Sequence, residues 1–327
     1  PERVSIVEAN EKHGFTQRLR EGSAAWMNRW LLKRDIHVDE TDFSILSDAD
    51  LQCTPQGQVL YLDGARRFFD LIQDRYARLK ADRPALSPEE LRAKILELTD
   101  AVAFDTIPAP PSEDKGEIAG DGYTIHKIVL KPAKDIVLPA LDYRPEGEAT
   151  RTILYCHGEG KEAAARGDAE ALAREGARVL AVDLRGLGET HSRENMKDWA
   201  FFVGADWTDF FRAYLIGESL VGMRVEDIFA CLKYLDTPQV EIVGVGEATV
   251  PVLHAAALAP GRVANVHLRE GIPSWEAVVQ TPGARQQLAH CVHGALAVYD
   301  LPDLVQLAGA DKVTQEDMQI PQFMPGK

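Results

Sequence analysis

The feature that most constrains the fold is a regular alternation of strand-like and helix-like segments between residues 151 and 268. The expected strands cover 151–156, 178–182, 240–245 and 263–268, and the expected helices cover 163–175, 221–235 and 249–259. This alternation predicts an α/β fold with a mainly parallel sheet and helices on both of its faces. Two earlier segments, 123–130 and 136–143, predict an antiparallel pair of strands.

Composition fits a globular protein that does not bind nucleic acid. The chain has 327 residues, of which 45% are hydrophobic, enough for a sizeable core. It carries 51 acidic against 36 basic residues, a net charge of −15. Nucleic acids and anionic membranes require a concentrated positive field, so neither is expected as a partner. No apolar run reaches the ~20 residues of a membrane span. The first residues do not resemble a signal peptide, although a removed signal would leave no trace, so localisation stays open.

The cysteine pattern indicates neither a disulfide framework nor a metal site. Cys53, Cys156, Cys231 and Cys291 lie far apart, without a C-x-x-C pair or a neighbouring His at metal-ligand spacing. We therefore expect small buried apolar residues at these positions.

The chain divides into three expected sections. In residues 1–34, an alternating segment over 3–9 predicts a strand, which a His-Gly turn and an amphipathic helix follow. Residues 35–115 predict a helical connector, with helices near 64–79 and 87–98 and a Pro-rich linker at 107–112. Residues 116–327 hold the expected α/β domain.

Three strand-to-helix turns could carry chemistry, because ligands gather at the carboxyl ends of parallel strands. The turns cover 156–160, 183–190 and 244–248. In the first, Gly158 and Glu159 could present backbone N–H groups to an oxyanion. The third contains Gly244, Gly246 and Glu247; it lacks both the Lys of a phosphate-binding loop and the last Gly of a dinucleotide motif.

Residues 122–303 resemble an α/β hydrolase, and most of all the bacterial carbohydrate esterases of the acetyl xylan esterase type. Residues 157–160 match the H-G-x-G oxyanion turn, 183–190 match the D-x-R-G-x-G-x-S turn, and 217–224 resemble the start of the helix before the nucleophile elbow. The resemblance implies ester hydrolysis by a Ser-His-Asp triad, with no metal and no organic cofactor. The substrate would be a small ester or a glycan.

The elbow departs from this family at its central position. Gly246 stands where G-x-S-x-G has its serine, and glycine cannot form an acyl-enzyme. Ser219 is better explained as a helix N-cap than as a replacement nucleophile. Glu247 is better explained as an acid at a helix start.

The later triad members are equally incomplete. Asp311 is a candidate remnant of the triad acid. His290 and His293 lie in the wrong chain order for the base, and His254 is expected to be structural.

The missing unit occurs at the other end of the sequence. Residues 1–34 resemble the closing strand, catalytic-His loop and last helix of an α/β hydrolase, which makes His13 the best catalytic candidate. The favoured explanation is a longer two-hydrolase polypeptide, in which residues 1–34 complete an upstream domain or a second chain that bears the serine. A circular permutation, with residues 1–34 completing the visible domain, is the alternative.

Two functions therefore stay open. The chain is part of a carboxylic, carbohydrate-type esterase, or it is a non-catalytic pseudo-hydrolase domain that acts as a scaffold or binds a glycan. Aromatic residues over 199–211 indicate a lid or a core helix, with sugar stacking as the alternative.

Overall fold

The computed structural model describes residues 2–42, 44–192 and 207–322. The chain divides into two compact units, Pro1–Ala65 and Arg66–Lys327, and each is described by itself. In the described residues, no helix is both long and apolar enough to cross a membrane.

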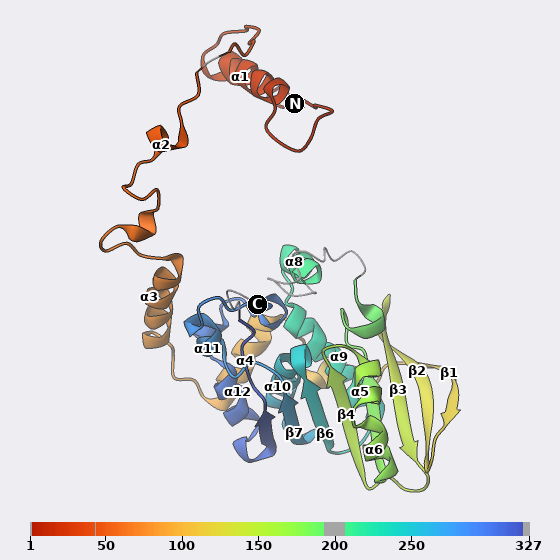
Figure 1. The fold of residues 1–327 in the computed structure, drawn as a ribbon. Helices are drawn as coiled ribbons and strands as arrows, with labels where there is room; N and C mark the ends of the chain where they lie inside the picture. Colours follow the sequence, from red (N-terminus) through yellow and green to blue (C-terminus); the bar gives the residue numbers. More distant parts are fainter. Residues whose placement is uncertain (1, 43, 193–206, 323–327) are drawn as a thin grey trace. The chain divides into compact units, whose positions relative to one another are not determined.

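A mixed sheet of eight strands is formed by the described residues of the second unit (Figure 1). The strands are β1 (Ser112–Ala119), β2 (Tyr123–Ala133), β3 (Ile136–Pro145), β4 (Arg151–His157), β5 (Ala177–Val182), β6 (Val240–Val245), β7 (Val263–Arg269) and β8 (Val313–Glu316). Their order is β1-β2-β3-β5-β4-β6-β7-β8; β1, β2, β3 and β5 pair antiparallel, and β5, β4, β6, β7 and β8 pair parallel. The predicted α/β fold is confirmed, as is every strand expected between 123 and 268.

Helices cover both faces of this sheet. One face packs against α5 (Lys161–Arg166) and α6 (Ala169–Arg174), and the other against α9 (Leu220–Leu235) and α10 (Thr249–Leu258). Successive side chains of β4 point to opposite faces of the sheet: Tyr155 lies in the hydrophobic core under α5 and α6, and Leu154 lies in the core under α9 and α10. The helix expected over 163–175 is divided at Gly167, which caps α5.

The second unit contains five further α-helices among its described residues. They are α3 (Phe68–Ala81), α4 (Pro88–Thr99), α8 (Trp207–Leu215), α11 (Trp275–Gln280) and α12 (Leu301–Ala308). Of the aromatic residues expected in a lid, those at 199, 201 and 202 lie outside the described residues. Phe210 on α8 is buried, in agreement with a core helix.

The expected connector over 35–115 is divided between the two units. The α4 side chain of Ile95 is fully buried, and Arg92 donates from Nε to the carbonyl oxygen of Ala257 at 3.0 Å. On α3, Gln73 donates to the carbonyl oxygen of Val279. The compact second unit begins at Arg66, so it includes α3 and α4 of the expected connector.

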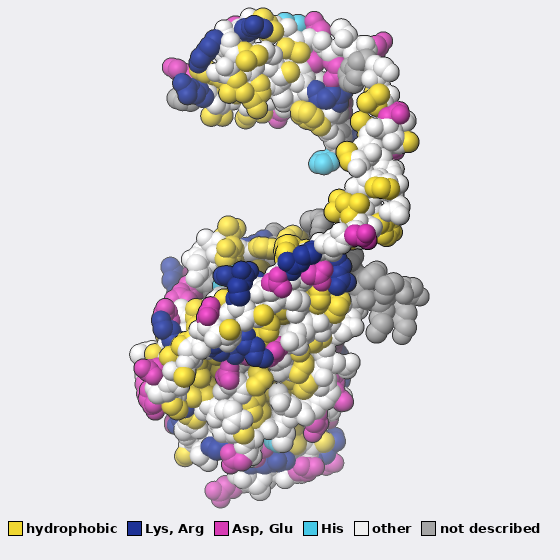
Figure 2. All heavy atoms as spheres, turned by 90° about the vertical axis from the view of Figure 1, so that its left-hand side faces the viewer, with side chains coloured by type: hydrophobic (Ala, Val, Ile, Leu, Met, Phe, Trp, Pro, Cys, Tyr) yellow, Lys and Arg dark blue, Asp and Glu magenta, His cyan; other side chains and the backbone are white. Residues whose placement is uncertain are grey.

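The first unit contains α1 (Gln17–Leu31) and α2 (Asp48–Leu51). The amphipathic helix is formed as predicted. Residues 3–9 form no strand, which corrects the prediction for them; a strand needs a neighbouring strand to bond its backbone, and the described residues 2–65 contain none. None of these described residues is buried. Figure 2 shows many hydrophobic side chains at the molecular surface.

Candidate functional site

The end of β6 forms a tight turn at Gly246 that leads through one 3-10 turn into α10. Gly246 has a φ of +61°, in the left-handed region that only glycine enters without strain. A Cβ atom added at Gly246 would meet no atom within 4 Å. At Gly244, by contrast, an added Cβ would lie 3.1 Å from Val252 and 3.3 Å from Leu268. The turn therefore holds position 246 at the end of the strand with open space before it.

The turn after β4 lies directly against this turn. The two strands are neighbours in the sheet, with His157 opposite Val245, and Gly158 N–H donates to the Val245 carbonyl oxygen at 2.9 Å. A Cβ atom at Gly158 would come within 2.7 Å of the Glu247 backbone nitrogen. Glycine is thus required here by close backbone approach. The structure therefore places the turn with Gly158 and Glu159 beside the turn at Gly246.

Both predicted oxyanion donors are already engaged. Gly158 N–H is bonded to Val245, and Glu159 N–H donates to Nδ1 of His157 at 3.0 Å. Burial lowers the pKa of His157, so its Nδ1 stays an acceptor at neutral pH. An oxyanion at this turn would have to displace one of these two bonds.

The turn after β5 is fixed to the turn after β4 by a buried carboxylate. Asp183 accepts hydrogen bonds from the Lys161 backbone at 2.6 Å, from Lys161 Nζ at 2.7 Å and from the Glu189 backbone at 3.0 Å. A Cβ atom added at Gly160 would lie 2.6 Å from Asp183 Oδ1, and one added at Gly188 would lie 2.1 Å from it, so neither position has room for a side chain. Burial lowers the pKa of Lys161, but its bonds to Asp183 and Glu189 outweigh this and raise the pKa. Lys161 therefore remains charged.

A second buried pair fixes the same turn to α9. Asp227, fully buried on α9, accepts from Arg185 N at 2.9 Å and from its guanidinium at 2.6 Å. Arg224, also fully buried, donates from Nε to the Arg185 carbonyl oxygen at 3.0 Å and lies 3.9 Å from the Glu247 carboxylate. Glu247 is thus an ion-pair partner at a helix start. Lys161 and Asp227 were not predicted as site residues, although Lys161 directly follows Gly160.

Neither a family model nor a curated protein matches the sequence. Among solved structures, a Bacteroides fragilis protein described as an acetyl xylan esterase matches with a TM-score of 0.59 and 16% identity, over 78% of this chain and 76% of that chain. The second unit has the α/β-hydrolase fold. Acetyl xylan esterase 1 from Thermoanaerobacterium sp. JW/SL YS485 matches with a TM-score of 0.45 and 13% identity, over 76% of this chain and 94% of that chain.

We call residues 66–322 the hydrolase unit, after its fold alone. In it the turn at Gly246 lies between β6 and α10, which is the strand-turn-helix arrangement predicted from the sequence for a nucleophile elbow. A nucleophile elbow would present a side chain at position 246, and glycine has none. Ser219, the nearest alternative considered in the sequence, is the N-cap of α9, and its Oγ accepts from Gly222 N–H at 3.3 Å. Its interpretation as a cap is confirmed.

The candidate acid does not lie at the elbow end of the sheet. Asp311 lies in the 3-10 turn Ala310–Lys312, before β8. Since β8 runs parallel to β7 and β6, Asp311 lies at their amino ends, whereas Gly246 follows a carboxyl end. The sequence position was misleading because β8, only four residues long, was not predicted.

The histidines of the hydrolase unit have structural surroundings. His254 is fully buried on α10, with Nδ1 2.8 Å from the Val250 carbonyl oxygen and Nε2 2.9 Å from the Tyr299 hydroxyl. Burial lowers its pKa to about 4. This confirms the structural role predicted for it. His293 packs against Tyr214 with ring centroids 4.5 Å apart, and His290 is buried.

The remaining site predictions concern His13, metals and cysteines. His13 belongs to the first unit, where it is exposed in the bend that precedes α1. In the part of the chain that the structure describes, no group of three or more His, Cys, Asp or Glu residues could hold a metal ion. All four cysteines are free; Cys156 and Cys231 are buried as predicted, whereas Cys53 is exposed.

The sheet face beyond α5 and α6 is polar at its β7–β8 end. The side chains there are His267, Arg269, Thr314 and Glu316, and all four are at least partly exposed. Arg269 donates to the Tyr155 hydroxyl at 2.7 Å and to Asp168 at 3.0 Å. This part of the face therefore offers polar groups rather than an apolar surface for a further helix.

Proposed function

We propose that this chain is part of an ester hydrolase of the carbohydrate-esterase type, and that its hydrolase unit is a non-catalytic copy whose serine counterpart lies outside the chain. The turn at Gly246 carries the proposal. It keeps the left-handed backbone and the open space of a nucleophile elbow, but glycine supplies no nucleophile.

Two further observations support the loss of catalysis in the hydrolase unit. The Gly158 and Glu159 N–H groups are bonded within the fold, so neither of them is a free donor for a tetrahedral intermediate. Asp311 lies at the amino ends of the parallel strands, so it does not reach the elbow as an acid.

The first unit is proposed to complete a different hydrolase sheet. None of its described residues is buried, although α1 is amphipathic and Val4 and Ile6 are 75% and 83% exposed. Such a segment gains its stability from a partner, because an isolated helix of this length is marginal in water. The partner would be an upstream domain or a second chain that lacks its last strand and helix.

The hydrolase unit of this chain is a poor alternative as that partner. The β7–β8 end of its sheet presents His267, Arg269, Thr314 and Glu316. An apolar helix face packed here would remove these polar groups from water without offering them hydrogen bonds in return, which is costly. The polar face thus supports the two-hydrolase explanation over the circular permutation.

In the completed enzyme, His13 would be the general base. The external serine would attack the ester carbonyl while His13 accepts its proton, and His13 would then return the proton to the leaving alcohol. Water would release the acyl group in the second half of the reaction. A neutral ester or glycan needs no positive field, in agreement with the net charge of −15.

The test is to sequence the gene upstream of residue 1 and to express the complete reading frame. We expect an upstream G-x-S-x-G, turnover of p-nitrophenyl acetate by the complete polypeptide, and a loss of at least about 10³-fold in kcat with His13→Ala. His37→Ala, which changes another exposed histidine of the first unit, is the matched control.

Turnover that survives His13→Ala would refute the role of His13. If neither the upstream sequence nor a co-expressed chain supplies a serine, the esterase proposal fails, and the non-catalytic scaffold or glycan-binding function replaces it.

A further inference from the structure

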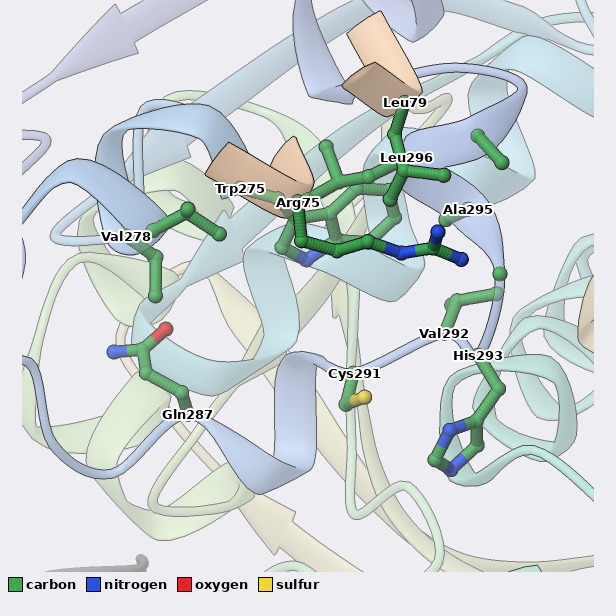
Figure 3. A pocket seen from close by; sticks show the side chains of 13 residues that line it. Arg75, Leu79, Trp275, Val278, Gln287, Cys291, Val292, His293, Ala295 and Leu296 are labelled. Atoms are coloured by element: carbon green, nitrogen blue, oxygen red, sulfur yellow. The ribbon is translucent and has the colours of Figure 1, made fainter. Parts of the chain in front are cut away.

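A pocket of about 420 Å³ lies in the hydrolase unit, away from the turns described above. It opens between α3, α11 and the segment 287–297 (Figure 3). Its size is within the ~300–1,000 Å³ of small-molecule sites, which are mostly apolar with a few polar groups. Trp275, Val278, Val292 and Leu296 supply much of the apolar wall.

The wall at Trp275 is held in place by hydrogen bonds. The Trp275 indole N–H donates to the His290 carbonyl oxygen at 2.9 Å, and its backbone N–H donates to Asp300 at 2.8 Å. The Tyr299 ring packs against it with centroids 5.5 Å apart. The pocket is therefore preformed on this side, so a ligand would not have to order it.

One cation lies at this pocket without a counter-ion. Figure 3 shows Arg75 extending across it from α3. In the part of the chain that the structure describes, the Arg75 guanidinium makes no ion pair and no hydrogen bond. Of the residues that the structure describes, no Asp or Glu lines the pocket, although acidic residues outnumber basic ones in the chain by 51 to 36. The pocket is thus suited to an anion at this end.

On the side of the pocket opposite Arg75 lies a hydrogen-bond acceptor, the side-chain oxygen of Gln287. Gln287 donates from Nε2 to the Arg285 carbonyl oxygen at 2.8 Å, which fixes the direction of its amide. Its Oε1 is buried and has no hydrogen-bond partner among the described residues. Figure 3 shows Gln287 and the Arg75 guanidinium on opposite sides of the pocket. A buried acceptor without a donor is costly, so a ligand donor that reaches it after a small turn of the Gln287 side chain would be favoured.

We propose that this pocket binds an amphipathic monocarboxylate with a hydroxyl group at its apolar end. The carboxylate pairs with the Arg75 guanidinium, the apolar body contacts Trp275 and Leu296, and the hydroxyl donates to Gln287 Oε1. Cys291 lines the pocket as a neutral thiol, because burial raises its pKa. The site is independent of the ester chemistry proposed above.

The test is isothermal titration of the full chain with 3-(4-hydroxyphenyl)propionate, compared with its amide, which lacks the charge, and with 3-phenylpropionate, which lacks the hydroxyl. We expect saturable one-site binding of the hydroxy acid and about tenfold weaker binding of both analogues. Arg75→Gln should weaken the acid about tenfold and leave the amide unchanged. Gln287→Met should abolish the preference for the hydroxyl.

Arg78→Gln is the matched control, since Arg78 is exposed on α3 and does not line the pocket. It should bind all three ligands as the parent chain does. The proposal is overturned if the acid gives no saturable heat at millimolar concentration, if Arg75→Gln and Arg78→Gln behave alike, or if the hydroxyl preference survives Gln287→Met. Circular dichroism of each variant verifies that the fold is unchanged.

Discussion

Replacing Gly246 by alanine should destabilise the chain by only about 1 kcal/mol. A non-glycine residue in the left-handed region costs about 1–2 kcal/mol, and the loss of glycine's freedom in the unfolded chain offsets about 0.4–1 kcal/mol of this. The added Cβ atom meets nothing within 4 Å, so no steric cost is added. The net effect is thus the strain of the left-handed turn reduced by this offset.

Two other glycines provide the comparison. At Gly158 the φ is not positive, but an added Cβ would lie 2.7 Å from the Glu247 nitrogen and 3.3 Å from the Val245 oxygen. Because both are backbone atoms, the turns must separate, and we expect Gly158→Ala to cost about 2–3 kcal/mol. Gly261 has neither a positive φ nor a neighbour within 4 Å, so Gly261→Ala should be neutral or slightly stabilising.

Urea unfolding of the three variants, followed by circular dichroism, measures these differences as midpoint shifts at a common m-value. The predicted order of destabilisation is Gly158→Ala, then Gly246→Ala, then Gly261→Ala. If Gly246→Ala is as destabilising as Gly158→Ala, the space in front of the elbow is not open, and the reasoning about a vacant nucleophile position is refuted.

Three more predictions concern buried polar groups. The free energy of unfolding should fall as the pH drops from about 6.5 to about 4, because the unfolded chain then binds a proton at His254 that the folded chain does not. The full effect is about 3 kcal/mol. If the difference in unfolding free energy between the parent chain and His254→Gln does not change with pH, this prediction is contradicted. Asp183→Asn should lower the free energy of unfolding, measured by thermal unfolding, by about 3 kcal/mol, since Lys161 loses its buried carboxylate. The double variant Asp183→Asn with Lys161→Met should recover part of this loss, and no recovery would argue against the Lys161–Asp183 ion pair. Ser219→Ala should cost about 1 kcal/mol in urea unfolding as the loss of a helix cap, and an unchanged midpoint would contradict the cap.

The alternation of strands and helices was sufficient to predict most of the sheet. Buried parallel strands such as 240–245 are continuous apolar runs between turns, so their limits are visible in the sequence. The glycines of the two turns were equally visible in the sequence. Gly158 is required by the close approach of a neighbouring backbone, and Gly246 is favoured by its positive φ.

Short or exposed elements were not predictable in this way. All residues of β1 are exposed, and β8 has four residues, so neither has an apolar pattern of its own. Because β8 was not predicted, Asp311 was wrongly considered as a remnant of the triad acid, although it lies before this strand. The strand predicted over 3–9 has a strand-like pattern but no neighbouring strand in the described first unit, which shows that pattern alone does not create a ladder.

The contacts that fix the site depend on side chains far apart in the sequence. Asp183 bonds Lys161, 22 residues away, and Asp227 bonds Arg185, 42 residues away. Local patterns carry no signal for such pairs. The same holds for the pocket between Arg75 and Gln287, since its two polar groups come from opposite ends of the hydrolase unit.

The central claim is that the hydrolase unit has no nucleophile of its own. Labelling the chain with a fluorophosphonate probe, followed by peptide mass spectrometry, tests it most directly, because the probe modifies an activated serine. The account predicts no labelled peptide from residues 66–322, in the parent chain and in Ser219→Ala alike. A label on the peptide that contains Ser219, lost in Ser219→Ala, would contradict it.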